Sequence, residues 1–231
     1  MQLFGGCCMN RDIAIDGPSG SGKTSVGLRV SEALDLMFVD SGLLYRVFTA
    51  AYVEQFPADQ HLDDVHLAQI LECPVNYEAD GTVQCDGKVL RLSLHSPEVD
   101  RLVSPISAVP RVRVAVNSEL RRIAIAHDVV MAGRDIGTTV LPKALLKVFM
   151  TADAEVRARR RVEQLKRQGL VADFAAVLEN IQERDKIDSS RQDSPLRWTD
   201  EYIIINNSLD GFDDAVQSIL LEYRRRLANA V

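Results

Sequence analysis

The strongest chemical pattern in the chain lies between residues 17 and 24, which read Gly-Pro-Ser-Gly-Ser-Gly-Lys-Thr and fit G-x-x-x-x-G-K-[ST] without exception. It follows a short apolar stretch ending in Asp16 and precedes a segment with helical periodicity. In that context the glycines let backbone N–H groups turn toward phosphate oxygens, and the helix N-terminus adds a partial positive charge. The pattern therefore predicts a loop that binds a nucleoside triphosphate, with the Lys23 amine on its β- and γ-phosphates and the Thr24 hydroxyl on Mg²⁺.

Arginine recurs at positions that suit a second anionic partner. Arg46 follows an Asp-Ser-Gly turn, Arg134 follows an apolar run, and residues 157–161 hold four arginines. Phosphoryl transfer between two anionic molecules requires several negative charges to be neutralised, and guanidinium groups do this with bidentate geometry. Arginines after strand ends and in segments that can move are typical of a donor–acceptor pocket with a closing lid. Further arginines with this potential are Arg111, Arg113, Arg184 and Arg191.

The elements that must position these groups alternate between strand-like and helical patterns. Strands are predicted over 12–15, 37–39, 129–132, 145–150 and 202–205, and helices over 23–34, 42–54, 110–126, 153–167, 173–187 and 212–227. Such alternation predicts an α/β fold, here a five-stranded parallel sheet flanked by helices on both faces. Residues 1–11 show no periodicity and are interpreted as a flexible leader, followed by a single domain over 12–231.

The pattern changes between residues 63 and 101. A short helix over 63–71 is followed by strand-like runs at 75–78, 82–85 and 88–90, which Asp80-Gly81 and Asp86-Gly87 separate. Asp-Gly between such runs is a strong hairpin signal. The sequence therefore predicts a small three-stranded antiparallel insert within the larger α/β unit.

Composition limits the possible function classes. The 231 residues include 27 lysines and arginines and 33 aspartates and glutamates, which gives a formal charge of −6. Because 46% of the residues are hydrophobic, this composition excludes a mostly disordered or fibrous chain. The longest apolar runs are too short to cross a membrane. The basic stretch 157–167 is amphipathic and lacks interleaved aromatics, which argues against nucleic-acid binding. Four cysteines without zinc-like spacing, and no signal-peptide pattern, favour a cytoplasmic protein.

Five motifs, in order and over nearly the whole chain, closely resemble bacterial cytidylate kinase, a family of P-loop nucleoside monophosphate kinases. They are I-D-G-P-S-G-S-G-K-T (15–24), D-S-G-L-L-Y-R (40–46), P-R-V-R (110–113), A-G-R-D-I-G-T (132–138) and E-R-D-K-I-D-S-S-R (183–191). The resemblance implies ATP-dependent phosphorylation of CMP and dCMP with Mg²⁺, an NMP-binding insert at about 63–101, a short helical lid at about 157–172, and a monomer. Many relatives read D-G-R-D where this chain has Ala132-Gly133-Arg134-Asp135.

The resemblance also implies roles for individual residues. Arg46 would bind the CMP phosphate, Asp188 the ribose hydroxyls, and Ser104, Arg113 and Asp135 the cytosine. The implied CMP site consists of Ser41, Arg46, Ser104, Arg113, Arg134, Asp135, Arg184, Asp188 and Arg191. The implied ATP site consists of Gly17, Pro18, Ser19, Gly20, Ser21, Gly22, Lys23, Thr24 and Ser25 with the lid arginines Arg157, Arg160 and Arg161. Catalysis would rest on Lys23, Arg134, Arg160 and Arg184, with Thr24 as the metal ligand.

Two alternatives stay open at this point. One is another small-acceptor kinase acting on UMP, AMP or shikimate, and the other is a nucleotide-sensing module without turnover. The hairpin insert and the P-R-V-R and G-R-D motifs argue against the first. The lysine, threonine and lid arginines argue against the second, because sensing alone needs no second phosphate pocket.

Overall fold

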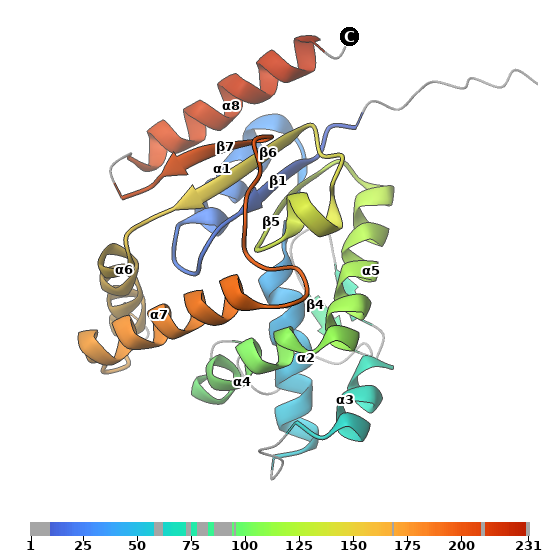
Figure 1. Ribbon diagram of the computed structural model, residues 1–231, viewed down its shortest axis with the longest axis vertical. Coiled ribbons are helices and arrows are strands. Elements are labelled where there is room, and N and C mark those ends of the chain that lie inside the picture. Colours follow the sequence, from blue (N-terminus) through green and yellow to red (C-terminus); the bar gives the residue numbers. More distant parts are fainter. Residues whose placement is uncertain are drawn as a thin grey trace, which may run out of the picture.

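The computed structural model describes residues 10–57, 62–72, 75–77, 83–85, 94, 96–167, 169–208 and 211–229. Its centre is a five-stranded sheet in the order β2-β5-β1-β6-β7 in which every pairing is parallel (Figure 1). The strands are β1 (Ile13–Asp16), β2 (Met37–Asp40), β5 (Val129–Gly133), β6 (Leu146–Thr151) and β7 (Tyr202–Asn206). The predicted α/β fold with a five-stranded parallel sheet is confirmed.

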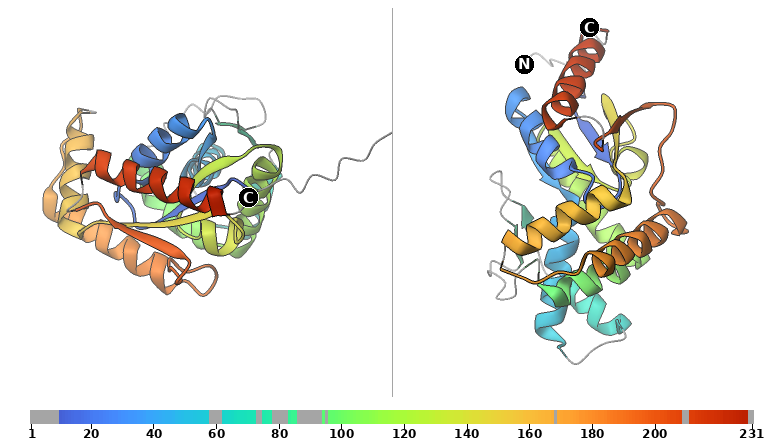
Figure 2. Two further views of the ribbon diagram at one scale, coloured as in Figure 1. Left: turned by 90° about the horizontal axis from the view of Figure 1, so that it is seen from above. Right: turned by 90° about the vertical axis from the view of Figure 1, so that its left-hand side faces the viewer.

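Two apolar clusters cover the two faces of this sheet. On one face α1 (Lys23–Leu34) and α8 (Phe212–Asn229) pack side chains such as Val26 and Ile219 against Ile13 and Ile15 (Figure 2). On the other face Ala14 and its neighbours meet four helices: α2 (Ser41–Gln55), α3 (Asp64–Leu71), α4 (Pro97–Ala108) and α5 (Pro110–Ala126). Because side chains of β1 alternate between the two clusters, both faces of the sheet are buried, as expected for a parallel sheet.

The remaining helices follow the carboxyl ends of the strands. Helix α6 (Ala154–Arg167) comes after β6, and α7 (Phe174–Ser190) packs against it (Figure 1). The carboxyl ends of β1, β2, β5 and β7 meet at the same edge, where α/β sheets bind their ligands. None of the helices in the described ranges is long and apolar enough to span a bilayer.

Helix α4 was not predicted, although its local signals are present. Ser96 caps it by accepting a hydrogen bond from the Val99 N–H at 3.3 Å, and Pro97 occupies the first turn. The internal Pro105 conceals the helix in the sequence because proline removes a backbone donor. The apolar spacing that could have revealed it is Val99, Leu102, Val103 and Ile106.

A single π-helical turn, η1 (Ile136–Val140), was also missed. The buried Asp16 carboxylate at the end of β1 accepts hydrogen bonds from the N–H groups of Ile136 (2.7 Å) and Gly137 (2.8 Å) and from the Tyr202 hydroxyl (2.8 Å). This carboxylate fixes the turn that follows Asp135, and no sequence spacing indicates such a contact.

The insert is described in part. Strands β3 (Val75–Tyr77) and β4 (Val83–Cys85) pair antiparallel, with Val75 opposite Cys85. The third predicted strand, 88–90, and both Asp-Gly turns lie outside the described residues. Of the predicted leader, residues 1–9 also lie outside them, whereas the Arg11 carbonyl accepts a hydrogen bond from Tyr223 at 3.2 Å.

Candidate functional site

The loop after β1 has the backbone that its glycines predict. Gly17 and Gly22 have φ angles of 150° and 95°, and a Cβ at either position would collide with Met150 O or Asn207 Nδ2, respectively. The Asn207 side chain, which follows β7, donates to Ser21 O at 2.8 Å and so holds the loop from the neighbouring strand end. Helix α1 begins at Lys23 without a side-chain cap, which leaves its first N–H groups directed at an anion site.

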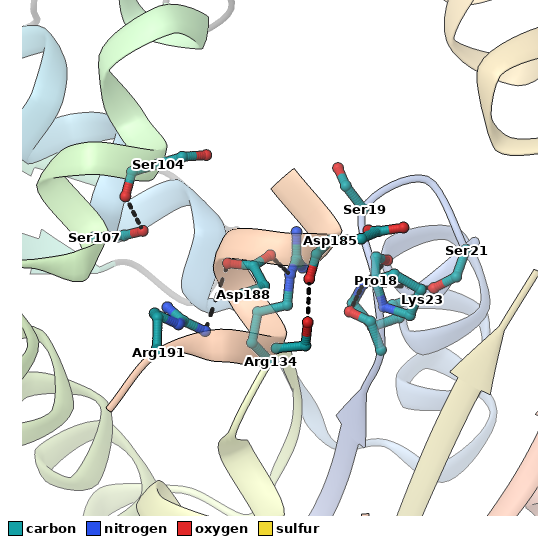
Figure 3. Close-up of polar contacts among 12 residues, drawn as sticks. Pro18, Ser19, Ser21, Lys23, Ser104, Ser107, Arg134, Asp185, Asp188 and Arg191 are labelled. Carbon is teal, nitrogen blue, oxygen red and sulfur yellow. Dashed lines mark hydrogen bonds and ion pairs between the residues drawn. The ribbon is translucent and has the colours of Figure 1, made fainter. Parts of the chain in front are cut away.

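Lys23 lies within this loop. Its Nζ donates to the carbonyls of Gly17 and Pro18, both at 2.7 Å, and its side chain is buried (Figure 3). Burial, together with the positive charge of Arg134, lowers the pKa of Lys23 well below its usual value of 10.5. Phosphate oxygens in the same place would stabilise this ammonium group, because a nearby negative charge favours the charged form.

Thr24 stands next to a carboxylate that the sequence analysis did not single out. Its Oγ1 donates to Asp40 Oδ2 at 2.8 Å, while Asp40 Oδ1 accepts the Gly42 N–H at 2.9 Å and caps α2. A hydroxyl and a carboxylate oxygen fit Mg²⁺, which takes one or two protein oxygens and keeps water and phosphate oxygens as its other ligands. Asp40 pairs in register with Ala132 of β5. The available signal for Asp40 was its place at the end of a predicted strand.

Arg113 and Asp135 form a buried ion pair from two separate elements. Arg113 Nη2 donates to Asp135 Oδ2 at 2.5 Å, and Nη1 donates to Ser107 O at 3.2 Å. The side chains are only 4% and 6% exposed. The Arg113 guanidinium lies 5.8 Å from the ring centre of Tyr45, and Arg113 Nε and the Tyr45 hydroxyl are buried without a hydrogen-bond partner among the described residues. Because buried polar groups normally have partners, these two atoms could form hydrogen bonds with a polar ligand.

Asp188 on α7 is the centre of an arginine cluster. Its Oδ2 accepts a hydrogen bond from Arg134 Nε at 2.8 Å, and Oδ1 lies 3.6 Å from Arg191 Nη2 (Figure 3). Burial would raise the pKa of Asp188, but the positive charges of Arg134 and Arg191 keep it below its usual value. Burial and the charge of Arg134 lower the pKa of Arg184 to about 10. Within the described part of the chain, Nε of Arg184 and both Nε and Nη2 of Arg191 are buried without hydrogen bonds. The cluster therefore has more cationic donors than acceptors.

Figure 3 shows the arrangement of these groups. In this view Arg134 and Asp188 fall between the P-loop residues on one side and Ser104 and Ser107 of α4 on the other. The electrostatic influence of Arg134 on Lys23 also places the two cations close together. The charge of Asp188 also influences both Lys23 and Arg113, so the P-loop and the Arg113–Asp135 pair border the same cluster at the carboxyl edge of the sheet.

The predicted lid arginines are all engaged by protein groups. Arg157 is buried and donates to Ser19 O at 3.2 Å and to both carboxylate oxygens of Asp185 at 3.1 and 2.6 Å, so it joins α6, α7 and the P-loop. Arg160 Nη2 donates to Asn207 O at 2.7 Å. Arg161 Nη2 donates to Asp100 on α4. Asp185 and Asp100 were not predicted as site residues, because their partners are distant in sequence.

The other predicted residues lie around the same edge. Arg46 Nη1 donates to Asp100 Oδ1 and to Leu94 O, both at 2.7 Å. Ser41 is buried at the start of α2, and Ser104 is half-buried on α4, where its carbonyl accepts the Ser107 hydroxyl at 2.9 Å. Ser25 is exposed in the first turn of α1. The ligand roles of these residues stay predictions.

Comparison with known proteins decides the family. The family model described as cytidylate kinase matches residues 13–225. The chain belongs to the cytidylate kinase family. Among its relatives, the cytidylate kinase of Rhodococcus opacus (strain B4) is 38% identical over 218 residues, covering 93% of this chain and 95% of that protein. The cytidylate kinase of Alkaliphilus oremlandii (strain OhILAs) is 35% identical over 211 residues, covering 90% and 95%, respectively.

A likeness to a solved structure concerns the fold alone. An uncharacterized protein from Eubacterium ventriosum shares 15% identity with a TM-score of 0.50, covering 92% of this chain and 97% of that one. Membership of the cytidylate kinase family therefore rests on sequence, and the arrangement of the site rests on the contacts described above.

Proposed function

We propose that this member of the cytidylate kinase family transfers the γ-phosphoryl group of ATP to CMP and dCMP, forming CDP or dCDP and ADP. The observation that carries this proposal is the shared edge of the sheet, where the P-loop Lys23 lies close to the buried cluster of Arg134, Asp188, Arg184 and Arg191. Two polyanions brought together repel each other, and a surplus of buried cationic donors is the arrangement that offsets this repulsion. A nucleotide-sensing module needs no such second cluster.

The chemistry requires positioning and charge neutralisation rather than a general base. An oxygen of the CMP phosphate attacks the γ-phosphorus while the bond to the β-phosphate oxygen breaks, and the electron pair leaves with ADP. Lys23 and the N–H groups of the P-loop hold the donor, and Arg134, Arg160 and Arg184 stabilise the charge that spreads over the transferred group. Thr24 and Asp40 would hold Mg²⁺, which neutralises charge on the β- and γ-phosphates.

The acceptor side supports cytosine as the base. Ser104, Arg113 and Asp135 together provide donors and acceptors that complement the amino, carbonyl and ring-nitrogen groups of cytosine. Uracil replaces the amino donor by an acceptor, which would face the Asp135 carboxylate. One such mismatch of buried polar groups costs about 1–3 kcal/mol, which corresponds to a discrimination of about 5- to 150-fold.

The proposal also covers the remaining acceptor residues, the insert, the lid and the setting in which the enzyme works. Arg46 binds the CMP phosphate with Ser41 and Arg191, and Asp188 binds the ribose hydroxyls. The segment 63–101 is the NMP-binding insert, and residues 157–172 form a lid that excludes water. The enzyme works as a cytoplasmic monomer whose partners are ATP, CMP and dCMP, without a nucleic-acid partner.

The test is release of ADP from Mg·ATP with each of CMP, dCMP, UMP, AMP, GMP and shikimate. We expect strong turnover with CMP and dCMP, weak turnover with UMP and none with the others. The Lys23→Met variant should lose turnover, whereas the matched control Lys186→Met, which removes an exposed lysine of α7, should keep it. A preference for another acceptor would refute the assignment of the acceptor site, and ADP release independent of acceptor would refute the kinase reaction.

A further inference from the structure

Asp100 joins the predicted acceptor arginine to the predicted lid. It lies in the first turn of α4, where its N–H donates to Ser96 O at 2.9 Å. Its Oδ1 accepts from Arg46 Nη1 on α2 at 2.7 Å, and its Oδ2 accepts from Arg161 Nη2 on α6. One carboxylate therefore connects three helices. Helices α2 and α4 share an apolar cluster, whereas α6 follows β6.

The geometry at Arg46 leaves one edge of its guanidinium for a ligand. Both hydrogen bonds that the described residues make to Arg46, to Asp100 and to Leu94 O, use the same nitrogen, Nη1. The opposite edge, Nε with Nη2, is the edge that binds a phosphate in bidentate fashion. An arginine side chain loses considerable rotamer entropy when it is fixed. Because the hydrogen bonds to Nη1 already fix Arg46, a ligand that binds the opposite edge does not have to pay this entropy cost.

We infer that Asp100 is a positioning residue for the acceptor phosphate, which holds Arg46 in place and is itself held by Arg161 when α6 lies against α4. This inference rests on the proposed role of Arg46 in CMP binding. The side chains of Arg46, Asp100 and Arg161 are 14%, 25% and 23% exposed, so solvent screens this network only in part. Arg46 is also close enough to repel Arg184, and the negative charge of Asp100 opposes that repulsion. Affinity for CMP thereby depends on a lid residue that does not contact CMP.

The experiment measures the dissociation constant of CMP by calorimetry, without ATP, for the full-length wild type and variants. Asp100→Asn should weaken CMP binding about tenfold, because a charge-assisted hydrogen bond that fixes Arg46 is lost. Arg161→Gln should weaken it about threefold while the Asp100 carboxylate is present. In the Asp100→Asn background the same Arg161→Gln change should have no additional effect, because coupled residues are non-additive. Steady-state KM for ATP, measured separately, reports any direct contact of Arg161 with the donor.

Matched controls remove the same charges from neighbouring exposed positions. Glu98→Gln lies in the same turn of α4, and Arg159→Gln lies in α6; both should leave CMP affinity within about twofold of wild type. Arg46→Gln tests the premise. If it leaves CMP affinity unchanged, the proposed acceptor role of Arg46 fails and the role of Asp100 with it. If Arg46→Gln weakens binding but Asp100→Asn does not, or if Asp100→Asn and Arg161→Gln act additively, only the positioning role of Asp100 is refuted.

Discussion

Replacement of Asp135 by alanine should separate what the buried Arg113–Asp135 pair does for stability from what it does for recognition. The variant leaves the Arg113 guanidinium buried with only the hydrogen bond to Ser107 O, since Arg113 Nε already has no partner in the described structure. Removing one partner of a buried ion pair costs about 3–5 kcal/mol, because the remaining charge is uncompensated. That is a large part of the about 5–15 kcal/mol by which folded domains are stable.

A second variant tests whether this cost comes from the uncompensated charge. In Arg113→Met/Asp135→Leu both charges are replaced by apolar side chains, a change that is often neutral for buried pairs. We expect its free energy of unfolding, from urea denaturation, to lie within about 1 kcal/mol of wild type. A double variant less stable than Asp135→Ala would refute this account, because it would show that the pair itself supplies the stability.

The double variant also isolates base recognition from folding. If Arg113 and Asp135 read cytosine, the ratio of kcat/KM for CMP to that for UMP should fall by about 5- to 150-fold, the equivalent of about 1–3 kcal/mol of lost hydrogen-bond matching. The assay is coupled ADP release with each acceptor at constant Mg·ATP. A folded double variant that keeps the preference of the wild type for CMP would refute the role of the pair in reading the base.

Three further results are expected. Because burial lowers the pKa of Lys23 and only its ammonium form binds phosphate, kcat/KM for ATP should fall as pH rises through an apparent pKa well below 10.5 in a pH–rate profile. Gly22→Ala should raise KM for ATP at least about tenfold through strain at φ 95° and collision with Asn207, whereas Gly169→Ala, at φ 76° in open space, should not change it. Burial raises the pKa of Asp16 from 3.8 to about 6. At pH values between these two, the folded protein therefore keeps a proton on Asp16 that the unfolded chain has lost. The free energy of unfolding of wild type relative to Asp16→Asn, from urea titrations, should therefore decrease by about 2 kcal/mol between pH 4 and pH 7, and an increase would contradict the sign.

The sequence predicted those features that local patterns encode. The P-loop follows from its glycines and Lys23, and the parallel sheet follows from apolar runs that alternate with helices. Helix α4 escaped because Pro105 interrupts its pattern, although its cap at Ser96 and its apolar spacing were available. In that case two local signals conflicted, and packing of the apolar face against the core decided the outcome.

The contacts between the arginines and their acidic partners had no local pattern in the sequence that could predict them. Asp100 contacts Arg46 and Arg161, which are 54 and 61 residues away, and Asp185 contacts Arg157 across two helices. An isolated acidic residue on a helix is usually a solvated charge, so the residue type alone does not identify Asp100 or Asp185 as a partner of a site arginine. These residues contact the arginines only because the fold brings their helices close together in space.

The hydrogen-bond balance of the proposed site would explain how an acidic protein can bind two polyanions. The formal charge of −6 is a sum over the whole chain, whereas the proposed site has a local excess of buried donors. Asp188 holds Arg134 and lies near Arg191, yet Nε of Arg184 and of Arg191 stays without an acceptor in the described structure. A buried donor that has lost its water without gaining an acceptor costs about 1–3 kcal/mol. Phosphate oxygens would remove this cost at several donors at once, so part of the binding energy is stored in the protein before the substrates arrive.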